Sequence, residues 1–222
     1  MSSEQKNQST LSTQRLEAFS DGVFAIVITL LFLNLKVPEM NNTEDWRELL
    51  NELYSALPKF MSIILSFIFV AIFWVAHHQF FHTLRETTRA LLWLNLIFLF
   101  LVCFVPFPAA VMTEFPNNKT AVVLFGATVL LTGVMLVALR WYAWMKHKEI
   151  TSITDDYQVK KALHRSVLIT VFNAVGLIVS FFNPAAAIVI YLFTPLALLF
   201  PVKIEVENDE ENSDEETREV VL

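Results

Sequence analysis

Residues 15–35 read RLEAFSDGVFAIVITLLFLNL, an apolar run that opens with charged and polar side chains. A helix needs about 20 apolar residues to cross the roughly 30 Å hydrocarbon core of a bilayer, so the length suits a transmembrane helix. Arg15, Ser20 and Asp21 stand at its start, and an ionisable side chain in a membrane span is costly without a partner. A passive span would not need such groups. The stretch therefore predicts a membrane helix with a functional role, most simply beside a pore or substrate path.

The composition separates an apolar body from an acidic end. The chain has 222 residues and is 55% apolar, above the range of soluble domains. Residues 203–222 hold nine of the 22 acidic residues, so 14 basic and 13 acidic groups remain in residues 1–202. We expect residues 203–222 to form a disordered cytoplasmic tail. A single cysteine, Cys103, excludes a disulfide framework or a Cys-rich metal site.

Six apolar runs are long enough, or nearly so, to cross a membrane. Each is predicted to be helical, because lipid cannot satisfy an open strand edge. Asn183-Pro184 separates the last two runs and predicts a tight turn in a helical hairpin. We therefore expect an all-α polytopic membrane protein with six transmembrane helices in residues 1–202. The runs are 18–37, 58–76, 90–112, 120–144, 163–182 and 184–201.

The distribution of Lys and Arg predicts the orientation. With the N-terminus inside, inner segments hold twelve of these residues and outer segments hold four, which places both termini in the cytoplasm. We expect a multi-pass protein of the cell membrane. Residues 38–57 are amphipathic and predict a short helix at the outer interface. Pro106 and Pro108 are expected to kink or end the third span.

Bulky apolar side chains form one stripe along the first helix. Asp21 lies about 140° from Ile26 around the helix, so a stripe that faced a pore would point Asp21 into protein, where it should be paired. Thr29 sits at the edge of the stripe, about 60° from Ile26. Periodicity alone favours ordinary helix packing, since every face of this helix is apolar. The stripe comprises Phe19, Val23, Ile26, Leu30 and Leu33.

Three histidines follow the second span in the sequence WVAHHQFFH. His78 and His82 are spaced i, i+4 and could bind a metal on one helix face. The Glu of an HExxH motif is missing and no Cys is near, so we assign no metal site.

Several polar residues are expected to meet near the cytoplasmic helix ends. Asn95 lies in the apolar run LLWLNL and needs a polar partner. In the predicted topology Arg15, Asp21, His77 and Asn95 fall at the same level of the membrane. They predict one polar network that joins helices.

The sequence lacks the common catalytic and nucleotide-binding motifs. It contains no Walker A, Rossmann, GxSxG or CxxC pattern, so nothing supports an enzyme, a cofactor or a nucleic-acid partner. A proton-coupled secondary transporter that uses Asp21 and His77 is an alternative to a channel. A third hypothesis is a scaffold whose acidic tail recruits a partner.

The stretch Arg15-x-x-x-Phe19-Ser20-Asp21-Gly22 closely resembles the RxxxFSDG signature of the prokaryotic relatives of the endolysosomal potassium channel, transmembrane protein 175. Trp74-x-x-His77 and Leu92-Trp93-Leu94-Asn95 are similar to that family's second and third helices. The resemblance implies a potassium channel with a non-canonical fold, without a TVGYG filter. It implies a homotetramer with one central pathway lined by the first helix.

The resemblance also implies roles for individual residues. Thr29 matches a hydroxyl position implicated in selectivity. A ring of four apolar side chains can close a pore by dewetting, and we expect a modest preference for potassium over sodium. The implied constriction is Ile26, Leu30 and Leu33, and the implied structural network is Arg15, Ser20, Asp21, His77 and Asn95.

Overall fold

The computed structural model describes residues 13–33, 37, 45–115, 117–146 and 156–194. Within these ranges the chain forms seven α-helices. They are α1 (Thr13–Phe32), α2 (Trp46–Phe81), α3 (Arg89–Phe104), α4 (Pro106–Glu114), α5 (Lys119–Met145), α7 (Asp156–Ser180) and α8 (Pro184–Phe193).

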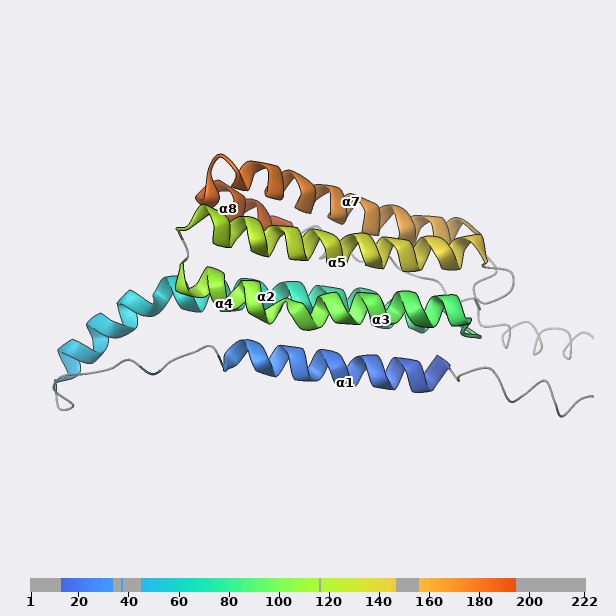
Figure 1. Cartoon of the computed structure of the whole chain (residues 1–222), viewed down its shortest axis with the longest axis horizontal. Helices are drawn as coiled ribbons and strands as arrows, with labels where there is room; N and C mark the ends of the chain where they lie inside the picture. The colour runs from blue at the N-terminus through green and yellow to red at the C-terminus, as the bar shows by residue number, and fades with distance from the viewer. Residues whose placement is uncertain (1–12, 34–36, 38–44, 116, 147–155, 195–222) are drawn as a thin grey trace, which may run out of the picture.

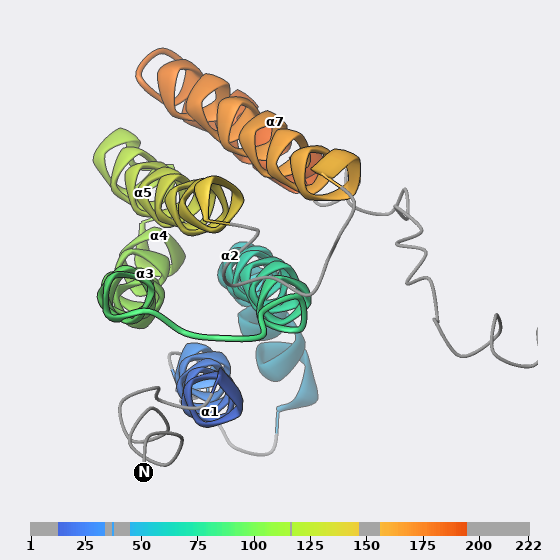
Figure 2. The ribbon, with the colours of Figure 1, turned by 90° about the vertical axis from the view of Figure 1, so that its right-hand side faces the viewer.

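The helices lie side by side along one direction, with α1 at one edge of the molecule and α7 with α8 at the other (Figures 1 and 2). α1 packs on α2, α3 and α4, while α5 connects these helices to α7 and α8. The position of α1 matters for function, because the described residues leave one side of it uncovered.

Four helical segments are long and apolar enough to cross a membrane: α2, α3 with α4, α5, and Lys160–Ser180 of α7. α1 has 20 residues, but it carries Arg15, Glu17 and Asp21. α8 is described over ten residues, and residues 195–201 of the predicted sixth span lie outside the described part. The prediction of an all-α, multi-pass membrane protein is confirmed.

One end of the bundle is tied together by polar side chains. The hydroxyls of Thr13, at the start of α1, and Thr87, in the α2–α3 loop, are 3.0 Å apart. The hydroxyl of Thr88, the N-cap of α3, lies 3.0 Å from that of Tyr142 near the end of α5. The first turns of α1 and α3 and the last turns of α2 and α5 therefore share one side of the bundle.

The third span breaks at Pro106, as predicted. α3 ends at Phe104 and α4 begins at Pro106. Proline has no backbone N–H and a fixed φ, so it interrupts a helix but suits the first position of the next one.

The short helix predicted within residues 38–57 is helical from Trp46 onward, but it does not end before the second span. Residues 46–57 are instead the first turns of α2, which runs without interruption past Pro58. Figure 1 shows this N-terminal part of α2 leaving the bundle at an angle. A proline inside a long helix commonly causes such a bend without ending the helix. Residues 38–44 lie outside the described ranges.

The predicted hairpin between the last two helices is confirmed. The Asn183 side chain accepts a hydrogen bond from the Ala186 backbone N–H at 3.1 Å, and Pro184 opens α8. The Tyr191 ring of α8 fills the space beside Gly126 of α5 and Gly176 of α7, where an added Cβ would collide with it. Small residues at helix contacts allow this close approach in membrane proteins.

Candidate functional site

The two faces of α1 differ in their surroundings. Ser20, Phe24 and Leu31 are buried against neighbouring helices. On the other side, Ile26 is 61% exposed, Leu30 41% and Leu33 77%. The predicted stripe therefore lies on the face of α1 that the described part of the chain leaves open.

A chain of hydrogen bonds joins the buried face of α1 to α2 and α3. His77 Nε2 of α2 lies 2.8 Å from Asn95 Oδ1 of α3. Asn95 Nδ2 donates to the Ser20 hydroxyl at 3.0 Å, and that hydroxyl donates to the Leu16 carbonyl at 2.8 Å. All three side chains are fully buried. Because buried polar groups need partners, this chain favours one arrangement of the three helices.

The direction of the bonds follows from the chemistry of the groups. Asn95 uses its amide N–H toward Ser20, so its oxygen must accept, and His77 must carry its proton on Nε2. His77 also makes stacked contacts with Phe98, at a ring-centroid distance of 5.4 Å, and with Phe81, at 4.3 Å. The imidazole is therefore held both by its hydrogen bond and by aromatic packing.

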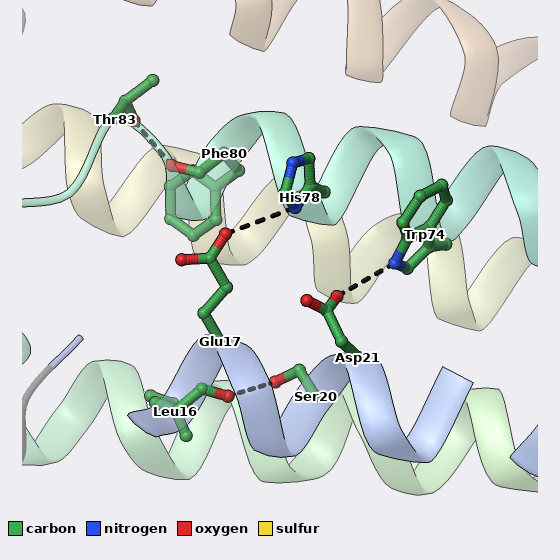
Figure 3. A network of polar contacts seen from close by, with 8 residues as sticks. All are labelled: Leu16, Glu17, Ser20, Asp21, Trp74, His78, Phe80 and Thr83. Carbon is green, nitrogen blue, oxygen red and sulfur yellow. Dashed lines mark hydrogen bonds and ion pairs between the residues drawn. The ribbon is translucent and has the colours of Figure 1, made fainter. Parts of the chain in front are cut away.

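Asp21 belongs to a second contact between α1 and α2. Its carboxylate accepts a hydrogen bond from Trp74 Nε1 at 2.9 Å. One turn earlier on α1, Glu17 Oε1 lies 3.3 Å from His78 Nδ1. Figure 3 shows both carboxylates pointing from α1 toward α2. The exposed stripe lies on the opposite side of α1 from these two residues.

Arg15 is separate from both sets of contacts. Its side chain is exposed, and within the described part of the chain it forms no hydrogen bond or ion pair with Ser20, Asp21, His77 or Asn95. Helix geometry places it about 20° from Ile26, on the open face of α1. The structure thus brings together Ser20, His77 and Asn95, pairs Asp21 with Trp74, and leaves Arg15 apart.

Thr29 is exposed beside the apolar stripe. Its hydroxyl donates to the Ile26 carbonyl of the same helix at 2.7 Å. This hydrogen bond uses the hydroxyl hydrogen and leaves the lone pairs of the hydroxyl oxygen available. The oxygen is therefore able to face a cation.

Arg140 is a residue whose position was not foreseen from the sequence. It is buried in α5, where Nη1 donates to the Ala162 carbonyl of α7 at 2.9 Å and Nη2 to the Ala76 carbonyl of α2 at 2.7 Å. From the sequence, Arg140 was assigned only as one of the twelve Lys and Arg residues of the inner segments. Its place within the apolar run LVALRWYAW was the sequence signal of a buried position. Arg140 connects α7 to the residue that precedes His77.

The chain resembles proteins of known class over most of its length. A family model described as the endosomal/lysosomal potassium channel TMEM175 matches residues 15–106. A potassium channel of Chryseobacterium sp. (strain P1-3) is 33% identical over 194 residues, which cover 85% of this chain and 93% of the relative. A potassium channel of Chamaesiphon minutus (strain ATCC 27169 / PCC 6605) is 35% identical over 150 residues, which cover 66% of this chain and 73% of the relative.

A solved structure has the same fold. The crystal structure of a lysosomal potassium-selective channel TMEM175 homolog from Chamaesiphon minutus matches with a TM-score of 0.75 and 29% identity. The match covers 84% of this chain and 96% of that chain. The chain belongs to the TMEM175 family.

Proposed function

We propose that the chain is one subunit of a potassium-permeable channel of the cell membrane, in which four copies surround a central pathway lined by α1. The observation that carries the proposal is the open face of α1 in a chain of this family, with Ile26 61% exposed at its centre. Both termini lie in the cytoplasm in this proposal, as the twelve inner and four outer Lys and Arg residues favour.

The open face of α1 supports assembly with further copies. Ala18, Gly22 and Ala25 are exposed beside the apolar stripe, and a Cβ added at Gly22 would meet nothing within 4 Å. Small residues allow helices to approach closely in a bilayer. Lipid would cover this face less closely than a helix of another subunit.

The proposed gate is a stack of apolar rings formed by Ile26, Leu30 and Leu33 from four subunits. Apolar side chains cannot replace the water around an ion, so a narrow ring excludes ions by dewetting. Opening requires the α1 helices to rotate or spread. Because Ser20 and Asp21 fix α1 to α2 and α3, these contacts set the resting position of the helix.

Thr29 is the proposed source of selectivity. A Thr29→Ala channel should lose much of its preference for potassium, because four hydroxyl oxygens that replace part of the hydration shell are gone. Thr29→Ser retains the oxygen and should retain the preference. The ratio of potassium to sodium permeability, measured from reversal potentials in planar bilayers, checks both. Equal ratios in the wild type and Thr29→Ala would remove Thr29 from this role.

Transport by the purified chain in liposomes tests the proposed function. We expect potassium flux that runs down the potassium gradient, needs no coupled ion and does not saturate as a carrier does. Flux that is driven uphill by a proton gradient would instead support the proton-coupled transporter. Asp21 and His77, the residues such a transporter would use, lie in separate contacts with Trp74 and Asn95.

A further inference from the structure

We propose that Glu17, Asp21 and His78 form a binding site for a divalent transition-metal ion such as Zn²⁺, which bridges α1 and α2. Each residue offers one ligand atom, and these three atoms all lie within 4.8 Å of one another. In a tetrahedral zinc site with bonds of about 2.1 Å, neighbouring ligand atoms are about 3.4 Å apart. Glu17 Oε1 and His78 Nδ1 are already 3.3 Å apart.

The site is built from two helices, which distinguishes it from an ordinary acidic surface. Glu17 and Asp21 are one turn apart on α1 and both face α2 (Figure 3). His78 turns Nδ1 toward them: this nitrogen is shielded from solvent and lies 3.3 Å from Glu17 Oε1. An imidazole nitrogen that has given up its proton is a ligand for zinc.

Trp74 supports the site from outside the ligand set. It donates a hydrogen bond to Asp21 Oδ1 at 2.9 Å, which leaves the second carboxylate oxygen for the metal. It also stacks on His78 at a ring-centroid distance of 5.7 Å. Hydrogen bonds and packing of this kind orient ligands in metal sites.

The donor set selects the class of ion. One imidazole nitrogen and two carboxylates suit zinc and neighbouring first-row metals, whereas Mg²⁺ and Ca²⁺ prefer oxygen ligands alone. Three protein ligands leave at least one position for water. The metal therefore replaces the Glu17–His78 ion pair with shorter bonds to both helices.

Calorimetric titration of the full chain, without a histidine tag, with ZnCl₂ tests the site. We expect one zinc per subunit, not displaced by millimolar Mg²⁺. Loss of a supporting residue alone weakens metal sites about 10–100-fold, so Glu17→Gln and His78→Gln should each weaken binding by at least about 100-fold. His82→Gln is the matched control and should bind as the wild type does. Unchanged binding in His78→Gln, or equal loss in His82→Gln, would overturn the site.

Trp74 provides a second readout that does not depend on folding assays or transport. Bound Co²⁺ should quench its fluorescence, and Zn²⁺ should reverse the quenching by competition. In Trp74→Phe the quenching should fall even at saturating metal, where calorimetry still gives one zinc per subunit, although the affinity drops about 10–100-fold with the loss of the Trp74 hydrogen bond. Quenching that is the same with and without Trp74 would place the metal elsewhere.

The consequence for transport rests on the proposed function. Since a metal bound to both helices resists movement of α1, zinc should reduce potassium flux in the wild type but not in Glu17→Gln or His78→Gln, each compared with its own zinc-free rate. Zinc binding in a chain that conducts no potassium would contradict the channel and leave the metal site standing. Flux without zinc binding would do the reverse.

Discussion

Ile26→Asn should raise potassium leak through the resting channel by at least about tenfold. The side chain is 61% exposed at the centre of the open face of α1, and four copies would place four amide groups in the proposed constriction. Polar groups hydrate a narrow ring and remove the dewetting barrier. A barrier lowered by only about 1.4 kcal/mol gives a tenfold higher rate. Liposome flux of potassium measures the leak.

A matched control is available on the other side of the subunit. Ile178 of α7 is 60% exposed, so Ile178→Asn introduces the same group at equal exposure but away from α1. Its leak should equal that of the wild type. Leu30→Ala, which widens the next ring, should also raise the leak. If Ile26→Asn leaks no more than Ile178→Asn, the constriction is not on this face of α1.

Asn95→Leu should lower the free energy of unfolding by about 1–3 kcal/mol, because it leaves buried polar groups on two other helices without partners. His77 loses the acceptor for its Nε2 proton, and Ser20 loses the donor that now reaches it from α3. The leucine has a similar volume, so the change removes hydrogen bonds with little change in packing. Unfolding of the purified protein in mixed micelles measures the effect.

Asn173→Leu provides the comparison for this variant. Asn173 is also buried, but its amide donates within its own helix, to the Ile169 carbonyl at 3.0 Å. The Ile169 carbonyl keeps its helical position when the Asn173 side chain is removed. The free energy of unfolding should therefore fall by well under 1 kcal/mol. Equal losses in the two variants would show that the Ser20–Asn95–His77 chain does not hold the helices together.

Much of the fold follows from local sequence features. Long apolar runs can only be helices in lipid, and the Pro106 break and the Asn183-Pro184 turn rest on residues that act locally. The helix boundary expected near Pro58 also rested on local sequence. The amphipathic pattern changes at Pro58, but α2 continues through that residue. A helix can continue where its surroundings change.

The candidate site was less predictable, because contacts between helices depend on how they pack. Helix geometry correctly turned Asp21 away from Ile26, but only the structure pairs it with Trp74. The same helix geometry places Arg15 near Ile26. The sequence therefore already argued against placing Arg15 and Asp21 in one polar network. The contact between Glu17 and His78 could not be predicted from either helix alone, because it depends on how α1 packs against α2.

The most direct test of the account is the structure of the full chain in lipid nanodiscs, determined by electron cryomicroscopy. We expect four subunits around one axis, with α1 innermost and Ile26 and Leu30 closest to the axis. Asp21 should lie on the far side of α1, against Trp74. A different number of subunits, or another helix lining the axis with the Ile26 face against lipid, would contradict it.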